Sequence, residues 1–563
     1  MRDPPRAAAT TIRFAAAPST HCYHARLMRT LVSEGGGRGS ASPDDGVDAP
    51  EPPASLATRL APFAVAGVVV LGICLRFFST SQLWLDEALS VNIARLPVGD
   101  MLDALRHDGH PPLYYLLLHG WMAVVGEGDA AVRALSGIIG VATLPLAYIA
   151  GKRMAGVDGG RWAVVVLSLS PYAVRYSTET RMYSLVMLLV LGGYLVLDDA
   201  LVKPTWGRLA ALTALSGALL LTHYWAFYLL AALGALLLLR WWRVPDERPT
   251  TLRVIVAVAL GAVLFLPWLG GFLYQSSHTG TPWGAPYRPT ELVQTTLNDL
   301  GGGLFSEAFL SGSVVFVLLF VALFAVRSTR TEMTLDLHTT PIVRRELAIV
   351  ISTAAVGTVV GYATSATYQS RYAAVFAPFV LLAVAVGITR FVGVARLVAA
   401  GFWVALSLFG LVWLQYFERT QSEVVADAVA ERVEPGDLVV YCPDQLGPAY
   451  SRALHRAIGD TPVTELAYPR LNEDVELVDW VDYADTNAAA DPAQIAEELR
   501  ARAGDNAIFV VWMSEYMTVE GQCESLVNNL GAGDQVVAED GKKFFEPANV
   551  HWFPSGRIAD GPS

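Results

Sequence analysis

The chain contains little charge. Only 16% of its 563 residues are charged, whereas 53% are hydrophobic, and its mean hydropathy is +0.41. A typical soluble domain carries about 25% charged residues, so this composition excludes that class and indicates a polytopic membrane protein. Nothing in the sequence suggests a nucleic-acid partner.

Cysteine is also scarce. The four cysteines are Cys22, Cys74, Cys442 and Cys523, and they form no CxxC pair and no Cys/His cluster. This pattern argues against a structural zinc site. Cys442 and Cys523 share the C-terminal part of the chain and could form a disulfide if that part lies outside the cytoplasm.

The charge that is present is unevenly distributed. Residues 421–563 hold 26 acidic and 9 basic residues, a balance of −17, whereas the whole chain carries −12. The preceding residues therefore carry about +5, and we expect a basic membrane part followed by an acidic soluble part. Residues 1–55 show no sustained periodicity and no signal-peptide core, and we predict a disordered cytoplasmic N-terminus. Whether Met1 or Met28 is the start stays open.

Eleven apolar segments are each near the length that crosses a bilayer, about 20 residues. A twelfth segment, 111–125, is short and begins with two prolines. If it does not cross, almost every basic connector lies on the cytoplasmic side, as the positive-inside rule requires. We therefore predict eleven spans, an inside N-terminus, an outside C-terminus and one long external loop over 79–131. The spans lie near 61–78, 132–150, 162–175, 182–200, 208–222, 224–240, 252–270, 313–326, 347–366, 372–389 and 396–416.

The first external loop carries an unusual set of polar residues. We expect an amphipathic helix over 87–106, with Leu89, Ile93, Leu96, Leu102 and Leu105 along one side. Ionisable residues beside apolar segments are functional candidates by default. The predicted topology brings the polar candidates to one face, which is otherwise poor in positive charge. These candidates are Asp86, Glu87, Asp108, His110, Arg133, Arg175, Glu179, Arg181, His223, Tyr224, Arg371 and Tyr372.

The acidic C-terminal part alternates strands and helices. Strands are expected over 436–443 and 505–513, with helices over 421–434, 446–457 and 519–530. This pattern predicts a small extracytoplasmic α/β domain over 421–563 with a mostly parallel sheet, after a membrane domain over 56–420. No GxGxxG follows either strand, so no nucleotide site is predicted.

These residue types suit the transfer of a group from a lipid phosphate at the outer face. A carboxylate, Asp86 or Glu87, takes a proton from the acceptor hydroxyl, while its neighbour positions a cation or a helix end. Arginine can grip the phosphate oxygens in pairs as the leaving group gains charge. The chain contains no D-x-D triplet, which argues against a soluble transferase that uses a sugar nucleotide.

Several readings stay open for single residues. Asp86 could instead cap a helix, Glu87 could be a helix-end charge, and Arg175, Glu179 and Arg181 could simply pair with one another. His223-Tyr224 could be an interfacial anchor, and Arg371-Tyr372 a helix end. No cofactor is certain, but a divalent metal held by Glu87, Asp108 and His110 is a further reading.

The motifs together resemble the GT-C superfamily of integral-membrane glycosyltransferases. They are WLDE (84–87), HPPLYY (110–115), AVRALSGIIG (131–140), SPYAVRYSTETRMYSL (170–185) and QSRYAAVFAPF (369–379). The similarity covers roughly 60–420 and is closest to the family 39 or protein O-mannosyltransferase-like enzymes, which also resemble aminoarabinose-lipid A transferase.

This resemblance implies an inverting transfer of a sugar from a polyprenyl-phosphate donor. It implies that Asp86 is the general base, with Glu87 beside it, and that His110 and Arg133 occupy family motif positions. The turn here continues Leu-Tyr-Tyr where protein O-mannosyltransferases have Gly-Lys, and we see no counterpart of their extra sugar-binding luminal module in these residues. The acceptor, whether lipid, glycan or protein, stays open, as does the sugar.

Two other functions compete with this one. A transporter or lipid flippase typically shows two related halves with broken helices at mid-membrane, and no such repeat is evident. A membrane ligase of whole glycans would use a larger external groove, which the loop 271–312 and the C-terminal part could supply.

Overall fold

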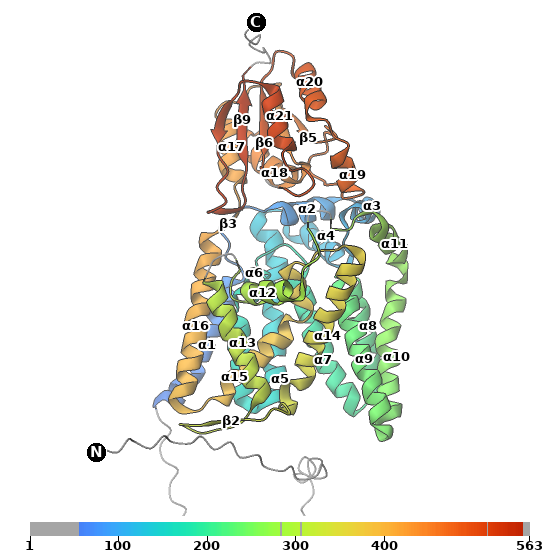
Figure 1. The fold of residues 1–563 in the computed structure, drawn as a ribbon, viewed down its shortest axis with the longest axis vertical. Coiled ribbons are helices and arrows are strands. Elements are labelled where there is room, and N and C mark those ends of the chain that lie inside the picture. The colour runs from blue at the N-terminus through green and yellow to red at the C-terminus, as the bar shows by residue number, and fades with distance from the viewer. Residues whose placement is uncertain (1–55, 282–283, 304–306, 515, 555–563) are drawn as a thin grey trace, which may run out of the picture. The chain divides into compact units, whose positions relative to one another are not determined.

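The computed structural model describes residues 56–554, except 282–283, 304–306 and 515 (Figure 1). The predicted disordered N-terminus, 1–55, lies outside the described residues. Leu60–Ser563 forms one compact unit, which holds a bundle of apolar helices and a small C-terminal α/β region. The predicted fold class is confirmed.

The eleven predicted apolar segments fall in helices. Among the described residues, six helical stretches are long and apolar enough to cross a membrane, and other apolar helices are shorter. One of the six, α5, covers two predicted segments, because its backbone leaves the helical conformation at Ala155 and Gly156. The helices are α1 (Leu56–Leu75), α5 (Asp129–Leu169), α7 (Tyr183–Val202), α8 (Trp206–Leu220), α9 (Trp225–Arg243), α10 (Arg248–Phe265), α13 (Ala308–Phe324), α14 (Pro341–Thr364), α15 (Ala377–Arg390) and α16 (Gly393–Tyr416).

The loop after α1 contains two helices where one was predicted over 87–106. They are α2 (Leu85–Arg95) and α3 (Val98–Asp108). Leu96 is extended, because a residue before proline avoids the helical conformation, and Pro97 follows it. The predicted apolar side is nevertheless buried, with Leu89, Ile93 and Leu105 all inside.

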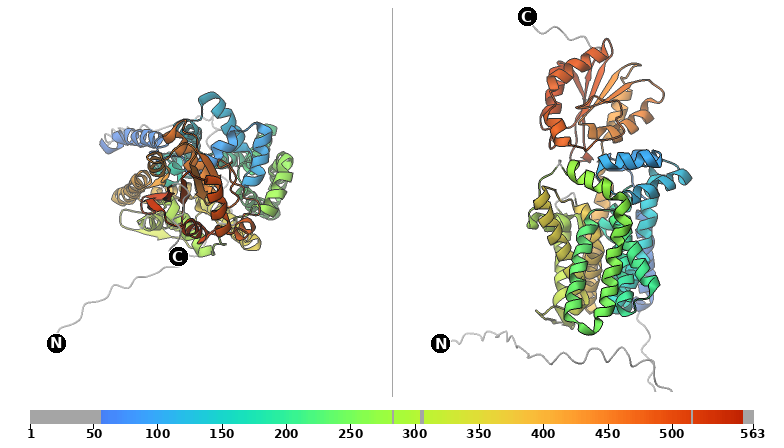
Figure 2. Two further views of the ribbon diagram at one scale, coloured as in Figure 1. Left: turned by 90° about the horizontal axis from the view of Figure 1, so that it is seen from above. Right: turned by 90° about the vertical axis from the view of Figure 1, so that its right-hand side faces the viewer.

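The next helix, α4 (Leu113–Val125), lies beside α2. At 13 residues it is about 20 Å long, well short of the roughly 30 Å hydrocarbon core. The His119 ring lies 2.8 Å from the Ala94 carbonyl oxygen of α2, and Glu127, just beyond α4, pairs with Arg95 at 2.8 Å. These contacts agree with a segment that belongs to the loop, whose blue helices lie across the end of the bundle, beneath the α/β region (Figure 2).

Short helices connect the bundle at this end and elsewhere, and a hairpin joins α13 to α14. The short helices are α6 (Pro171–Arg175), η1 (Pro245–Glu247), η2 (Leu266–Trp268), α11 (Leu269–His278), α12 (Pro289–Leu300) and η3 (Ser370–Val375), and the hairpin strands are β1 (Ala325–Ser328) and β2 (Met333–Leu335).

The α/β region contains a five-stranded sheet with the order β5-β4-β6-β9-β7. β4 pairs in parallel with β5 and β6, but β9 runs antiparallel to β6 and β7. Because β9 is antiparallel to both of its neighbours, β5, β4, β6 and β7 run in one direction and β9 runs against them, so the sheet is mostly parallel, as predicted, with one reversed strand. Its elements are α17 (Ser422–Ala430), β4 (Leu438–Cys442), η4 (Asp444–Leu446), α18 (Gly447–Ile458), β5 (Thr464–Ala467), α19 (Tyr483–Ala488), α20 (Pro492–Ala503), β6 (Ile508–Trp512), α21 (Gln522–Leu530), β7 (Asp534–Val537) and β9 (Asn549–Phe553).

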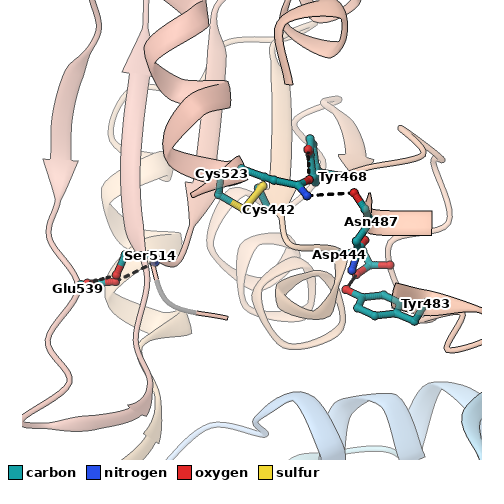
Figure 3. The surroundings of a disulfide bond; sticks show 9 residues. Cys442, Asp444, Tyr468, Tyr483, Asn487, Ser514, Cys523 and Glu539 are labelled. Carbon is teal, nitrogen blue, oxygen red and sulfur yellow. Dashed lines mark hydrogen bonds between the residues drawn. A yellow bond between two sulfur atoms is a disulfide. The ribbon is translucent and has the colours of Figure 1, made fainter. Parts of the chain in front are cut away.

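Direct contacts join this region to the loop helices. Beyond α16, β3 (Glu418–Thr420) pairs in parallel with β8 (Phe544–Glu546), and α18 packs against α2. The Trp480 N–H donates to the His107 carbonyl oxygen of α3 at 3.1 Å. A disulfide joins Cys442 to Cys523 (Figure 3), as the sequence suggested. These contacts bring Arg419 and Glu546 to the start of α2.

Candidate active site

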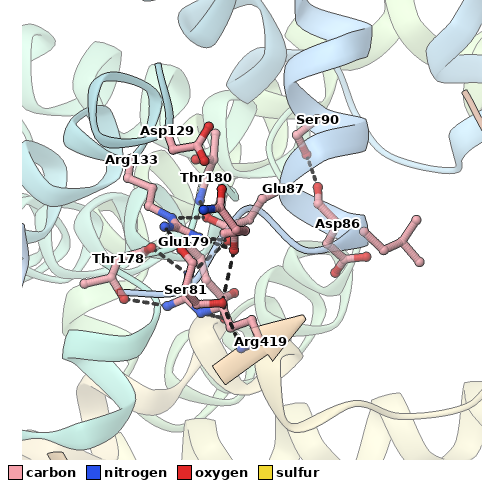
Figure 4. A network of polar contacts seen from close by, with 12 residues as sticks. Ser81, Asp86, Glu87, Ser90, Asp129, Arg133, Thr178, Glu179, Thr180 and Arg419 are labelled. Carbon is pink, nitrogen blue, oxygen red and sulfur yellow. Dashed lines mark hydrogen bonds and ion pairs between the residues drawn. The ribbon is translucent and has the colours of Figure 1, made fainter. Parts of the chain in front are cut away.

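Asp86 and Glu87 occupy the first turn of α2 and point in different directions (Figure 4). Each carboxylate lies in its own cluster of charged side chains. The Glu87 cluster consists of Glu87, Arg133, Arg175, Glu179 and Arg419. The Asp86 cluster consists of Asp86, Asp108, His110, Arg181 and Arg371.

The Glu87 carboxylate is completely buried and its hydrogen bonds are filled. Arg133 donates from Nε to Oε1 at 2.8 Å and from Nη2 to Oε2 at 2.6 Å. Arg419 donates to Oε2 at 3.0 Å, and the Thr180 N–H donates to Oε1 at 2.9 Å. Burial raises the pKa of Glu87, but Arg133 and Arg419 outweigh it and hold the pKa below its usual value.

The oxygens of the buried Glu87 carboxylate already accept hydrogen bonds from Arg133, Arg419 and the Thr180 N–H. Glu87 is therefore not positioned to accept a proton from a substrate. The sequence predicted that one carboxylate would position a cation, and Glu87 holds two. Arg133 is equally committed, since it also donates to the Ser81 and Gln82 carbonyl oxygens at 2.6 and 2.9 Å. This geometry favours a structural role for Glu87 and Arg133 over the predicted catalytic and phosphate-binding roles.

Arg175 and Glu179 complete the Glu87 cluster. Arg175 pairs with Glu179 at 3.3 Å and with Asp299 of α12 at 3.1 Å, and Arg419 lies 4.0 Å from Glu179. Burial raises the pKa of Glu179 despite the two arginines. The alternative reading of a local Arg175–Glu179 pair matches this arrangement.

The Asp86 carboxylate is more open. Its side chain is 15% exposed, against 0% for Glu87, and Oδ2 lies 3.0 Å from the Arg371 guanidinium and 3.9 Å from Arg181 Nε. Arg371 also lies over the Trp84 ring, 5.9 Å from its centroid. Asp86 is thus a partly accessible carboxylate held between two arginines.

A chain of hydrogen bonds fixes the cationic side of the Asp86 cluster. Arg181 donates to His110 Nε2 at 2.9 Å, so His110 carries its proton on Nδ1, which lies 2.7 Å from Asp108. Arg181 also donates to Ser90 Oγ at 2.9 Å, and Tyr115 donates to Asp108 at 2.9 Å. Burial raises the pKa of Asp108, but His110 and Arg181 hold it below its usual value. The predicted His110 and Arg181 therefore meet beside Asp86.

His223 and Tyr372 form an aromatic wall next to this cluster. The two rings lie 5.2 Å apart, and the Tyr183 ring lies 5.8 Å from His223. Burial lowers the pKa of His223 well below its usual value, and the charges of Arg181 and Arg371 lower it further. Among the described residues, neither His223 Nε2 nor the Tyr183 hydroxyl has a hydrogen-bond partner. Both are available to an oxygen-rich ligand.

Tyr224 lies outside both clusters. Its hydroxyl donates to Gln275 of α11 and accepts from Trp268 Nε1 at 3.0 Å. Gln275 in turn donates to the Leu105 carbonyl oxygen at 2.6 Å. These contacts favour a role in holding α11 against α3 over the predicted contact with a substrate.

The predicted metal ligands Glu87, Asp108 and His110 lie in two different clusters. No group of three or more His, Cys, Asp or Glu side chains that could hold a metal is found among them. Glu87 is bound to arginines, whereas Asp108 and His110 pair with each other. The set of Glu87, Asp108 and His110 does not fit a metal ion.

Sequence reasoning missed Arg419, Asp299 and Glu546. Arg419 had a usable signal, because it follows the last span on the face where positive charge is scarce. Glu546 Oε1 accepts a hydrogen bond from the Leu85 N–H at 3.3 Å. The two residues are separated by 461 positions in the sequence, so no local pattern predicts this contact.

Known proteins share this architecture. The family model described as dolichyl-phosphate-mannose-protein mannosyltransferase matches residues 109–270, and a search of curated proteins finds no match. The chain aligns with the crystal structure of ArnT from Cupriavidus metallidurans bound to undecaprenyl phosphate, at a TM-score of 0.56 and 13% identity, over 90% of this chain and 100% of that one.

Two further structures are also similar. The apo state of the same ArnT gives a TM-score of 0.56 at 12% identity, over 90% of this chain and 100% of that one. The Archaeoglobus fulgidus oligosaccharyltransferase gives 0.45 at 11% identity, over 79% of this chain and 67% of that one. The resemblance predicted from the motifs is confirmed: the chain has the GT-C fold of ArnT, and residues 109–270 match a mannosyltransferase family model.

Proposed function

We propose that the protein is a membrane glycosyltransferase that moves a sugar from a polyprenyl-phosphate donor to an acceptor hydroxyl, with inversion. The Asp86 cluster carries this proposal. It places a partly accessible carboxylate between two arginines on a fold shared with ArnT, whose crystal structure contains undecaprenyl phosphate.

In the proposed reaction Asp86 is the general base. It accepts the proton of the acceptor hydroxyl as the oxygen attacks the anomeric carbon of the sugar. The bond from that carbon to the phosphate oxygen breaks, and polyprenyl phosphate leaves with one additional negative charge. Arg371 and Arg181 stabilise this charge, and the relay of His110 and Asp108 keeps Arg181 aimed at it.

A small pocket lined by aromatic side chains lies near the proposed phosphate site. Trp225, Tyr228, Tyr287 and Tyr368 line it, and the Trp225 ring lies 5.9 Å from that of Tyr372. The pocket therefore lies next to the aromatic wall of the Asp86 cluster, and we expect the first isoprene units of the donor to lie against its aromatic rings.

We place this end of the molecule on the extracytoplasmic face. The distribution of arginine and lysine supports this placement, and so does the Cys442–Cys523 disulfide, because disulfides persist outside the cytoplasm. An engineered Val157→Cys, in a chain without Cys22 and Cys74, should resist a membrane-impermeant maleimide added from outside, whereas Glu497→Cys should react. Labelling of Val157→Cys alone would reverse the proposed orientation.

The activity itself is tested by transfer from radiolabelled polyprenyl-phosphate sugars in membranes. Asp86→Asn should lower the rate by about 10²- to 10⁴-fold, the contribution typical of a general base. Asp103→Asn, which alters an exposed carboxylate on α3, is the matched control and should keep the rate. Full transfer by Asp86→Asn would show that Asp86 is not the base.

A further inference from the structure

Two loops of the α/β region follow neighbouring parallel strands. β4 and β6 pair in parallel register, with Cys442 opposite Trp512. Asp444 and Gln445 come directly after β4, and Tyr516 follows β6. The carboxyl ends of parallel strands are where α/β sheets usually bind ligands, so these loops are candidates for a binding surface.

The same edge of the sheet faces the Asp86 cluster. The Asn92 side chain of α2 donates to the Glu476 carbonyl oxygen at 2.9 Å, and α18, which follows Gln445 directly, packs against α2. Burial raises the pKa of Tyr516, the charges of Asp86 and Asp444 raise it further, and Arg371 lowers it. Tyr516 thus lies within electrostatic reach of the proposed base and of a phosphate-binding arginine.

Gln445 has unsatisfied hydrogen-bonding capacity at this edge. The residue is 2% exposed, and within the described part of the chain its amide contacts the Tyr516 hydroxyl but makes no other side-chain hydrogen bond, so most of its hydrogen-bonding capacity is unfilled. Its neighbour Asp444 is by contrast satisfied by the Tyr483 hydroxyl at 2.6 Å (Figure 3). An unsatisfied buried amide is costly, so its retention calls for an explanation such as a ligand.

We infer that Gln445 and Tyr516 bind hydroxyl groups of a sugar ring at the Asp86 site, so that the α/β region forms the sugar-recognition wall of the transferase. This inference rests on the proposed function. A primary amide presents one acceptor and two donors, and a phenol presents one of each, which suits neighbouring ring hydroxyls. A site built this way discriminates against sugars that leave its polar groups unpaired.

The ring could belong to the donor or to an acceptor glycan, since both present the same hydroxyl chemistry. Binding measurements without acceptor separate the two sources. The probes are undecaprenyl phosphate and its mannose, glucose, galactose and arabinose derivatives, added to purified full-length protein in detergent. The variants are Gln445→Leu and Tyr516→Phe, and Gln494→Leu on the exposed surface of α20 is the matched control.

If the ring is that of the donor, the wild type binds one sugar-linked lipid more tightly than undecaprenyl phosphate. Each variant then binds that sugar-linked lipid about tenfold more weakly than the wild type does. Affinity for undecaprenyl phosphate itself stays unchanged. Unchanged donor affinity with slower transfer to the acceptors in native membranes would assign the ring to the acceptor. Unchanged binding and unchanged transfer would overturn the inference.

Two controls separate the remaining explanations. A purely structural Gln445 would make Gln445→Leu melt earlier, whereas removal of an amide whose hydrogen bonds are mostly unfilled should leave the melting temperature nearly unchanged. If the wild type binds neither undecaprenyl phosphate nor any derivative, the proposed function itself fails. The proposed function and the inference are both supported if the variants still bind undecaprenyl phosphate but no longer discriminate between the sugars.

Discussion

The Glu87 cluster and the Asp86 cluster lie on two sides of one helix turn, yet they differ in how far their hydrogen bonds are filled. Glu87 accepts from Arg133, Arg419 and a backbone N–H, and its side chain is fully buried. Asp86 meets Arg371 and Arg181 at 3.0 and 3.9 Å and stays partly exposed. Adjacent carboxylates can therefore divide the work, one holding the loop and the other remaining able to take a proton.

Glu87→Gln should break the structural half of this comparison. The substitution removes the buried carboxylate that Arg133 and Arg419 share, and breaking a buried ion pair costs about 3–5 kcal/mol. Thermal unfolding in detergent measures the loss. Glu476→Gln removes an exposed partner of Arg95 and should cost about 0–1 kcal/mol. Equal melting of the two variants would contradict the structural role of Glu87.

Arg371→Gln and Arg181→Gln should weaken donor binding at the Asp86 cluster. Each removes a charge-assisted hydrogen bond to phosphate worth about 1.5–3 kcal/mol, which corresponds to roughly 10- to 100-fold in affinity. Titration with undecaprenyl phosphate gives the dissociation constant. Arg106→Gln on the exposed side of α3 is the control. If both variants bind undecaprenyl phosphate as tightly as Arg106→Gln does, neither Arg371 nor Arg181 binds the phosphate.

Glu546 is a buried carboxyl like Glu87, but its pKa is raised whereas that of Glu87 is lowered, so we expect a smaller effect that depends on pH. Burial raises its pKa to about 8, so the folded protein binds a proton that the unfolded chain releases above about pH 4–5. Stability should therefore fall as pH rises from about 5 to about 8, then level off. Glu546→Gln should flatten this profile of melting temperature against pH. A profile identical to that of the wild type would show that Glu546 is charged in the folded protein.

The sequence predicted which residues share a face better than it predicted how they pair. Apolar periodicity and positive-inside bias are local signals, and they placed Asp86, His110, Arg181 and Arg371 at one end of the bundle. Pairing depends on contacts between distant segments, such as Arg419 with Glu87, which no local pattern reports. The antiparallel return of β9 beside β6 is unpredictable for the same reason.

The sequence contains a signal for the break between α2 and α3, namely Pro97. The apolar spacing over 87–106 continues across Leu96, but Pro97 disfavours a helical conformation at the preceding residue. The division of residues 87–106 between two helices matters for the site, because Asp86 and Asp108 then lie on separate helices, α2 and α3. Asp86 lies in the first turn of α2 and Asp108 ends α3, and Arg181 connects them through Ser90 and His110.

Paired measurement of Asp86→Asn and Glu87→Gln tests the division of roles most directly. Each purified variant is assayed for single-turnover sugar transfer and for melting temperature under the same conditions. Asp86→Asn should lose transfer by about 10²- to 10⁴-fold while it melts close to the wild type, because an amide can still accept from Arg371. Glu87→Gln should lose mainly its thermal stability. Full transfer by Asp86→Asn, or a stable Glu87→Gln that cannot transfer, would contradict the assignment.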